Sequence, residues 1–305
     1  MKRIIILIIA AAFCAGASAQ EKRWAVVELS TVYMRQQPDY ESPLETQELM
    51  GTVVEITGEK SYWREILSPQ PYKAWATEKG LVEMSQEQIR EYEKAAKVMF
   101  TDLYGHIFTE PSAKSRTLCD LVGGDLMRIV RKHGAWTEVM LPSGRKGWVK
   151  SSQLKNHEGF TSIAKGEGSS ESISDEMMEK IIAQAERLVG VPYLWGGMSA
   201  KGVDCSGLVR ISYLMNGILL PRNASQQIFC GDKVPFGIEN LRRGDLVFFG
   251  TPAAEGRKQR VTHVGIYIGN NHIIHSSHVV RINSLIPTDA DYYENSHRFI
   301  GAIRL

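Results

Sequence analysis

The chain has 305 residues, more than one ordinary domain, and 43% of them are hydrophobic, so it can bury two or three separate cores. Its formal net charge at pH 7 is only +2, whereas proteins that bind nucleic acid usually carry a clear basic excess. The composition therefore argues against nucleic acid as a partner and favours neutral or mixed-charge molecules.

Residues 1–19 have the pattern of an export signal. A Lys-Arg start precedes an apolar run from Ile4 to Ala15, and small residues then form a cleavage pattern before Gln20. The run is too short to span a membrane, so we expect an exported protein of the periplasm or cell envelope without stable membrane insertion. A lipid anchor on Cys14 is a minor alternative, because a phenylalanine rather than a small residue precedes it.

Three cysteines remain once this signal is removed: Cys119, Cys205 and Cys230. An odd, small number in an oxidising compartment argues against a disulfide framework, and a pair between Cys119 and Cys230 is a minor alternative to two packed thiols. The chain has no Cys-x-x-Cys pair, so a structural zinc site is not expected.

The next part of the chain contains an internal repeat with an offset of 73 positions. Six markers of the first copy recur in the second without a gap: Pro38, Gly51, Trp63, Pro69, Trp75 and Leu81 match Pro111, Gly124, Trp136, Pro142, Trp148 and Leu154. Each copy reads as about five short strands, which is typical of a small barrel that closes on itself. The arrangement resembles the bacterial SH3 domain, so we expect SH3-like domains at 20–85 and 101–156.

Two connecting segments flank the second copy. Residues 86–100 follow Ser85 and place Ile89, Tyr92, Ala96 and Met99 at helical spacing, which predicts a linking helix. Residues 157–172 are polar and rich in glycine and serine, which predicts a linker or an extended arm.

A third unit is expected from residue 173 to the end of the chain. Ser174 is a candidate cap for an amphipathic helix that ends at Gly190, and a second helix is predicted from about Ser206 to Met215. Four strands follow in "DLVFFG", "THVGIYIG", "HIIHSS" and "FIGAIRL". Helices followed by a run of strands predict an α+β domain with an antiparallel sheet.

Cys205 lies at the start of the second of these helices. A thiol attacks an amide carbonyl as the thiolate, so it needs a lowered pKa, a base and a stabilised oxyanion. A helix start offers free N–H groups and the positive end of the helix dipole, which favour the thiolate. His263 and His275, on neighbouring predicted strands, are the candidate base and orienting residue.

The two histidines are an even number of positions apart, so they share a face of the sheet only if the hairpin loop is odd or a bulge shifts the register. We therefore predict such a loop or bulge, and imidazoles on opposite faces would rule out a triad. A packed cysteine and an ordinary sheet histidine are the alternative. The residues alone leave both open.

Four segments, "YLWGGMSAKGVDCSGLVR", "LRRGDLVFF", "THVGIYIG" and "HIIHSS", together resemble the NlpC/P60 cysteine peptidases, a papain-like family that acts on bacterial cell-wall peptides. The resemblance implies Cys205 as nucleophile, His263 as base and His275 as the orienting residue. It also implies that Tyr193 helps to form the oxyanion hole, and that Asp204 and Ser206 contact substrate. No metal or organic cofactor is implied, because a thiolate and an imidazole complete the reaction.

Two SH3-like domains before such a domain resemble one branch of the family, the γ-D-glutamyl-L-diamino acid endopeptidases of the dipeptidyl-peptidase VI type. This implies cleavage of murein peptides with a free N-terminal L-Ala, after L-Ala-γ-D-Glu and before L-Lys or meso-diaminopimelate, with the first SH3-like domain narrowing the site. A site that recognises a free ammonium leaves its buried acceptors unpaired when the amine is capped.

Further substrate contacts follow from the same resemblance. Tyr72 is a candidate substrate-contacting tyrosine, and Trp195 lines the pocket or packs against it. Asn223 stands where an aspartate is common, so it adds no charge to amine binding, and Arg222 is expected to be structural. The acidic partner of the amine is one of three positions near the corresponding loop: Gln37, Glu41 or Glu45.

Two other functions stay open at this stage. One is a hydrolase of intact peptidoglycan, and the other is an inert protein that binds the wall through its SH3-like pair. A monomer is expected, and the sequence does not distinguish lysine from diaminopimelate.

Overall fold

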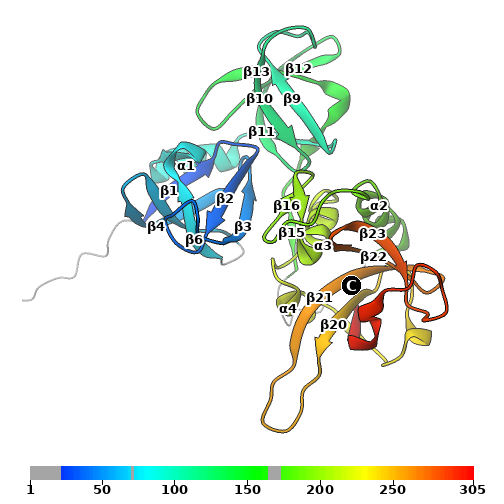
Figure 1. Ribbon diagram of the computed structural model, residues 1–305. Helices are drawn as coiled ribbons and strands as arrows, with labels where there is room; N and C mark the ends of the chain where they lie inside the picture. The colour runs from blue at the N-terminus through cyan, green and yellow to red at the C-terminus, as the bar shows by residue number, and fades with distance from the viewer. Residues whose placement is uncertain (1–21, 70–71, 164–172) are drawn as a thin grey trace, which may run out of the picture.

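The computed structural model describes residues 22–69, 72–163 and 173–305 (Figure 1). The predicted export signal and most of the predicted linker lie outside these ranges. Within them, no helix is both long and apolar enough to cross a membrane.

The first β-rich region is a seven-stranded antiparallel sheet. Its strands, in chain order, are β1 (Arg23–Val27), β2 (Thr31–Arg35), β3 (Leu44–Leu49), β4 (Val53–Lys60), β5 (Trp63–Leu67), β6 (Lys73–Thr77) and β7 (Leu81–Met84), with a short 3-10 helix at Glu78–Gly80. They pair in the order β3-β2-β6-β5-β4-β1-β7. Alternating apolar residues such as Val32, Met34, Val54, Ile56 and Ile66 fill the core of this sheet.

The second β-rich region repeats this arrangement. Its strands are β8 (Lys97–Phe100), β9 (Tyr104–Phe108), β10 (Thr117–Val122), β11 (Leu126–His133), β12 (Trp136–Met140), β13 (Lys146–Lys150) and β14 (Leu154–His157), with a 3-10 turn at Ser151–Gln153. The order is β10-β9-β13-β12-β11-β8-β14, the same order as in the first sheet. The two end strands are not paired in either described sheet, so the strand order establishes two curled sheets of equal topology rather than closed barrels.

The helix predicted at 86–100 is shorter than expected. Helix α1 spans Gln86–Lys94 and starts with a capping box between Ser85 and Gln88. It ends at Ala95, whose backbone is extended, and residues 97–100 form β8 instead. The prediction was wrong beyond Lys94 because Val98 and Phe100 alternate with period two and enter the core of the second sheet.

The C-terminal region combines helices with a six-stranded antiparallel sheet. Its helices are α2 (Asp175–Glu186), α3 (Cys205–Leu214) and α4 (Ala224–Gln227). The sheet contains β19 (Asp232–Val234), β20 (Leu246–Thr251), β21 (Arg260–Gly269), β22 (His272–Ser277), β23 (Val279–Ser284) and β24 (Phe299–Arg304), in the order β19-β24-β20-β21-β22-β23. Two-stranded pairs join β15 (Thr161–Ser162) to β18 (Ile218–Leu219) and β16 (Met198–Ser199) to β17 (Gly202–Val203), and 3-10 turns lie at Ile238–Asn240 and Glu294–Arg298.

Helix α3 lies against one face of this sheet. Leu208 of α3 belongs to the same buried cluster as Val264 and Ile266 of β21 and Ile274 of β22. The antiparallel α+β arrangement is therefore confirmed, although β19 and β23 were not predicted. Both flank the predicted strands and carry charged residues among their apolar ones, which weakened the strand pattern.

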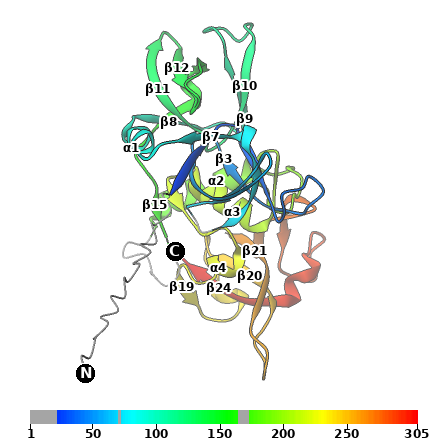
Figure 2. The same ribbon diagram turned by 90° about the vertical axis from the view of Figure 1, so that its left-hand side faces the viewer.

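The two β-rich regions and the C-terminal region meet around α3. Figure 2 shows the first region in front of α2 and α3, with the second region above it. Strand β3 lies against β16, and Asp125 of the second region accepts hydrogen bonds from the N–H groups of Met50 (3.2 Å) and Val122 (2.8 Å). These contacts place β3 at the centre of the junction.

Candidate active site

Cys205 is the first residue of α3, as the sequence predicted to within one position. Asp204 caps the helix, because its Oδ1 accepts from the N–H of Gly207 at 2.7 Å. Gly207 is required here, since a Cβ at this position would lie 2.0 Å from the carbonyl oxygen of Gly197. The glycines thus let the helix start pack directly on the preceding turn, with the thiol at its first residue.

His263 and His275 lie on the same face of the sheet. The β21–β22 register shifts between Tyr267 and Gly269, and Asn270 and Asn271 form a tight turn with φ of 50° and 60°. His263 Nε2 and His275 Nδ1 are 2.7 Å apart. The predicted bulge is therefore confirmed, and the condition that would have ruled out a triad is not met.

Gly265 makes room for this contact. Its position lies opposite His275, and a Cβ there would be 3.2 Å from the Cβ of His275. His275 leans along the sheet over Gly265 to reach His263, two residues further along β21. A larger residue at position 265 would crowd the imidazole pair.

Asn283 and Tyr293 complete the surroundings of the two histidines, and the sequence interpretation missed both. Asn283, on the unpredicted strand β23, places Oδ1 3.0 Å from His275 Nε2. The ring of Tyr293 packs against both imidazoles, with centroid distances of 5.5 Å to His263 and 4.4 Å to His275. The alternation in "VVRINS" was the one signal for Asn283, and the sequence carried no signal for Tyr293.

Desolvation keeps the thiol and the imidazoles neutral. It raises the pKa of Cys205 to about 12, aided by the Asp204 carboxylate and opposed by backbone N–H groups of Val264 and Ser206. It also lowers the pKa of His263 to about 3 and that of His275 to about 4. The expected lowering of the thiol pKa at the helix start is thus outweighed by burial, so the thiol must lose its proton during the reaction.

Tyr193 faces the same site. The backbone N–H of Tyr193 donates to the carbonyl of His278 at 2.9 Å. Tyr193 also forms a parallel β-bridge with Val203, just before α3. Desolvation raises the pKa of its hydroxyl to about 12, with Cys205 and Asp204 adding to the shift. The hydroxyl therefore keeps its proton and is available as a hydrogen-bond donor.

Asp204, Ser206 and Arg222 form a buried polar network. Asp204 Oδ2 accepts from Arg222 Nη2 at 2.6 Å and from the N–H of Gly196 at 2.9 Å. Ser206 Oγ donates to Asp204 Oδ1 at 3.1 Å and lies 3.0 Å from Arg222 Nη1. The network fixes the start of α3, and Arg222 has the structural position that was expected.

Glu45 and Tyr72 bring the first β-rich region to the site. The Tyr72 hydroxyl donates to Glu45 Oε2 at 2.7 Å, and the side chain of Asn223 also hydrogen-bonds this tyrosine. Gly196, which binds Asp204, lies directly against the backbone of Glu45. Of the three candidate positions for the amine partner, Gln37 is neutral and Glu41 is exposed, whereas Glu45 joins this group.

Two other candidate residues differ in exposure. Trp195 is 64% exposed beside Gly196, so it is not part of the core. Asn223 is half-buried at the start of α4, in contact with Tyr72. Trp195 is thus open to solvent at the edge of the Glu45 group, whereas Asn223 belongs to that group.

The neighbouring residues of β3 attach the first region to the C-terminal region. Thr46 Oγ1 accepts from Arg222 Nε at 2.8 Å, and Gln47 Oε1 accepts from the N–H of Met198 at 2.9 Å. Glu48 is buried, faces Arg210, and has a pKa raised by desolvation. Four consecutive polar residues of one strand therefore lie at this interface.

A cavity of about 600 Å³ lies at the same junction, lined by Glu48, Tyr92, Leu126, Arg210 and Leu214 among others. It contains none of the candidate catalytic residues. It is therefore distinct from the site at Cys205.

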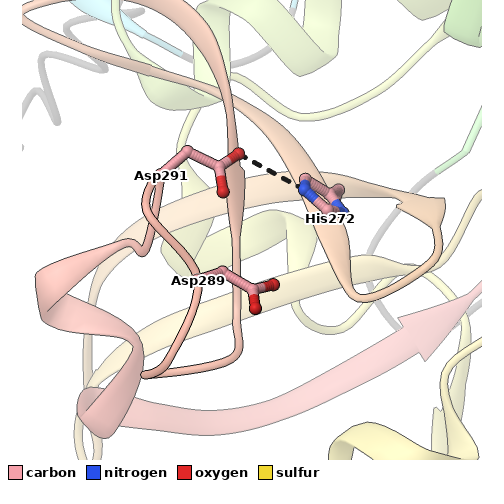
Figure 3. Close-up of side chains that lie close together, drawn as sticks. All are labelled: His272, Asp289 and Asp291. Atoms are coloured by element: carbon pink, nitrogen blue, oxygen red, sulfur yellow. Dashed lines mark ion pairs between the residues drawn. The ribbon is translucent and has the colours of Figure 1, made fainter.

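One cluster of possible metal-ligand types lies among the described residues, at the turn after β23 (Figure 3). His272 Nε2 is 3.3 Å from Asp291 Oδ2, and Asp289 Oδ2 accepts from Ser284 Oγ at 2.6 Å. Each side chain thus has a protein partner, and both aspartates are exposed. We interpret the cluster as an anchor for the segment that follows β23.

The two remaining thiols are packed and unpaired. Cys119 and Cys230 are both free, so the minor alternative of a disulfide between them is wrong. Desolvation raises the pKa of Cys119 to about 12 and that of Cys230 to about 11. Unlike Cys205, neither thiol has a histidine pair beside it in the part of the chain that the structure describes, so no base is placed to activate it.

Comparison with known proteins gives consistent matches. A sequence profile described as "NlpC/P60 family" matches residues 190–298. A γ-D-glutamyl-L-lysine dipeptidyl-peptidase of Bacillus cereus is 30% identical over 258 residues, covering 82% of this chain and 72% of that protein. Dipeptidyl-peptidase 6 of Lysinibacillus sphaericus is 26% identical over 290 residues, covering 92% and 98%.

Among solved structures, an NlpC/P60 family protein from Bacillus cereus has a TM-score of 0.73 at 23% identity. The match covers 92% of this chain and 99% of that protein. At this level of identity it shows a shared fold across both β-rich regions and the C-terminal region.

Proposed function

This chain belongs to the NlpC/P60 family of cysteine peptidases, and on that basis we propose that it hydrolyses the γ-D-glutamyl–L-diamino acid bond of murein peptides with a free N-terminal L-Ala. The product is L-Ala-γ-D-Glu, and the role is turnover or recycling of cell-wall peptides. One relative similar over most of the chain is named γ-D-glutamyl-L-lysine dipeptidyl-peptidase and another dipeptidyl-peptidase 6, which supports the proposed bond.

The observation that carries the substrate proposal is the group of Glu45, Tyr72 and Asn223 beside Asp204 and Cys205. A carboxylate on this side of the site suits an ammonium, because a charge-assisted hydrogen bond satisfies both groups. Tyr72 holds the carboxylate, and Asn223 adds an uncharged acceptor. An acylated amine would leave Glu45 without its partner.

The proposed reaction has two halves. The Cys205 sulfur attacks the γ-carbonyl of D-Glu as His263 accepts the thiol proton, and His263 then returns that proton to the leaving amine of the diamino acid. Water hydrolyses the thioester with His263 as base. The Tyr193 hydroxyl and the N–H at the start of α3 stabilise the oxyanion.

The other site residues have supporting roles. His275 orients His263, whereas Asp204 and Ser206 position the start of α3 and face the bound peptide. Trp195 lies at the exposed edge of the Glu45 group, where it contacts the bound peptide. No cofactor or metal takes part in this scheme.

We further propose that the β-rich regions are two SH3-like domains before a catalytic domain at 173–305. The first spans 20–85, and the second, expected at 101–156, begins at Lys97 instead because β8 belongs to its sheet. The matching strand orders of the two sheets support this division. An exported monomer in the periplasm or envelope fits a substrate released from the wall, and the SH3-like pair offers a contact with peptidoglycan.

Incubation of the protein with L-Ala-γ-D-Glu-L-Lys at neutral pH under reducing conditions tests the proposal. We expect release of L-Ala-γ-D-Glu and lysine by wild type and none by Cys205→Ala. Absence of this product from wild type would contradict the proposal. Replacing lysine by meso-diaminopimelate in the same assay decides which diamino acid is preferred.

Two alternatives give different results in a matched assay on sacculi. Solubilised fragments with wild type and none with Cys205→Ala would indicate a hydrolase of intact peptidoglycan. Equal binding of both variants to sacculi, with no product from sacculi or tripeptide, would indicate an inert wall-binding protein. Intact Cys205 and His263 argue against the second alternative.

A further inference from the structure

Asn283 lies at the far end of a hydrogen-bonded chain that runs through His275 to His263. Its Oδ1 is 3.0 Å from His275 Nε2, and His275 Nδ1 is 2.7 Å from His263 Nε2. We propose that Asn283 is a positioning residue that fixes the tautomers of both histidines, so that His263 presents an unprotonated Nδ1 to the Cys205 thiol. This inference rests on the proposed thiol–imidazole chemistry.

The orientation of the Asn283 amide is set by a second contact. Its Nδ2 donates to the main-chain carbonyl of Asp291 at 2.6 Å. A carbonyl only accepts, so the amide nitrogen must face Asp291 and the amide oxygen must face His275. If the Asn283 amide were reversed, its oxygen would face the carbonyl oxygen of Asp291, and two acceptors would lie together without a proton between them.

The tautomers follow from this orientation. Because Asn283 Oδ1 only accepts, the proton of a neutral His275 must be on Nε2, which leaves Nδ1 as an acceptor. His263 must then donate its own Nε2 proton to His275. The free lone pair of His263 is therefore on Nδ1, the nitrogen that remains for the thiol proton.

The same chain of hydrogen bonds also stabilises His263 when it becomes protonated. When His263 takes the thiol proton, its Nε2–H still donates to His275, and the imidazolium is stabilised by an acceptor that Asn283 holds in place. An uncontrolled His275 could instead present an Nδ1 proton to His263, which would favour the wrong tautomer. A wrong tautomer of the general base is costly in catalysis even when the geometry is kept.

The surroundings give the two histidines no other fixed partner for this purpose. Arg281 and Arg298 both lower the pKa of His263, and Arg281 lowers that of His275, so the nearby cations oppose a second proton. Tyr293 packs against the imidazole rings. Among these groups, Asn283 is the one that accepts a hydrogen bond from His275.

The segment that holds Asn283 is itself anchored. Asp291, whose carbonyl fixes the amide, pairs through its carboxylate with His272 at the start of β22 (Figure 3). Ser284, the next residue after Asn283, donates to Asp289 in the same turn. The anchor thus supports Asn283 without touching His263 or His275.

Long-range ¹⁵N–¹H spectra of the histidine-labelled protein at pH 7 test the inference directly, with assignments from single His→Gln variants. We expect both His263 and His275 as Nε2–H tautomers in wild type and in Asn283→Asp, which keeps an acceptor. In Asn283→Leu, we expect an Nδ1–H population of His275 to appear. A wild-type His275 with its proton on Nδ1 would overturn the inference.

Kinetics supply the second readout. Loss of a group that controls a general base lowers rates by about 10- to 100-fold, so we expect kcat of Asn283→Leu to fall in this range with KM changed less than twofold. Asn283→Asp should recover most of the loss and move the acid limb of activity to higher pH, because a carboxylate favours the His275 imidazolium. If Asn283→Leu leaves both histidine tautomers and kcat unchanged, the inference is contradicted.

Ser284→Ala is the matched control. It loosens the same turn but leaves the amide oxygen of Asn283 in place, so the tautomers and kcat should stay as in wild type. A fall in kcat equal to that of Asn283→Leu would indicate a merely structural role. If wild type shows the predicted tautomers but no peptidase activity, the proposed function fails while the tautomer assignment stands.

If Asn283→Leu does not fold, the wild-type spectrum and the Asp variant still decide the question. Loss of the Nε2–H tautomer of His275 in a folded Asn283→Asp would contradict the inference.

Discussion

The two β-rich regions have the same strand order, yet only the first supplies residues to the candidate active site. In the first, β3 carries Glu45, Thr46, Gln47 and Glu48 to the C-terminal region. At the same positions of the second repeat, 73 residues later, stand Leu118, Cys119, Asp120 and Leu121. The two regions therefore share a strand order but differ in role, and the side chains of a single strand make the difference.

The second region instead holds the first in place. Arg145, at the position equivalent to Tyr72, pairs with Glu28 of the first region at 2.7 Å. Asp120, equivalent to Gln47, accepts from Ser30 at 3.0 Å and pairs with Lys201 at 2.6 Å. These contacts hold the two β-rich regions together and also join the second region directly to the C-terminal region at Lys201.

Arg222, which binds Asp204 and also Thr46 of β3, should matter most for stability. Arg222→Met leaves Asp204 buried without its ion-pair partner, so we expect a loss of about 3–5 kcal/mol in the free energy of unfolding, measured by urea denaturation. Lys201→Met removes the half-exposed link to Asp120 and should cost less than about 1 kcal/mol. Equal losses of unfolding free energy in Arg222→Met and Lys201→Met would contradict the different roles given to the first and second β-rich regions.

The amine-binding role of the first region predicts the next largest effect. A hydrogen bond to a charged group contributes about 1.5–3 kcal/mol, so Glu45→Gln should lower kcat/KM on L-Ala-γ-D-Glu-L-Lys by about 10- to 100-fold. Glu41→Gln, an exposed carboxylate four residues earlier, is the control and should stay within twofold. If Glu41→Gln and not Glu45→Gln lowers the rate, the assignment of the amine partner is wrong.

The dependence of kcat/KM on pH also tests whether the site recognises the substrate ammonium. The pKa values of His263 (about 3), His275 (about 4), Cys205 (about 12) and Tyr72 (about 12) all lie outside pH 5–9. The substrate amine, with a pKa near 8, loses its charge in this window. We therefore expect kcat/KM to fall about tenfold from pH 7 to pH 9, and a flat profile would argue against recognition of the ammonium.

Tyr72 should give a smaller effect, because Tyr72→Phe removes one neutral donor from Glu45. About 0.5–1.5 kcal/mol is expected for such a bond, which corresponds to a two- to tenfold lower kcat/KM. Arg145→Met, at the equivalent position of the second repeat, should leave kcat/KM unchanged once the protein is folded. A larger effect of Arg145→Met would show that the second region takes part directly.

Much of this arrangement follows from local sequence pattern, and the rest depends on contacts between distant segments. The helix at Cys205 and the two histidine strands each have a signal within about ten residues, and the repeat is visible as a constant offset of 73 positions. The extent of α1 was overestimated because Ala96 and Met99 fit a helical period, while Val98 and Phe100 pack as a strand in a sheet formed later in the chain.

The amine end of the site shows the same limit. Glu45 could not be separated from Gln37 and Glu41, since its contact with Tyr72 depends on how β3 and β6 are arranged in the first region. Asn283 was missed because its importance arises from one hydrogen bond to His275 across two strands. The thiol pKa was misjudged because burial depends on the whole fold, whereas the helix start is a local feature.

The most direct test of the account compares kcat/KM for L-Ala-γ-D-Glu-L-Lys with that for the same peptide acetylated on its N-terminal amine. If the first β-rich region recognises the ammonium through Glu45, acetylation should lower kcat/KM by about 100-fold or more, because it removes the charge and leaves the carboxylate without a cationic partner. Equal turnover of the two peptides would contradict the account and would favour a hydrolase of intact wall.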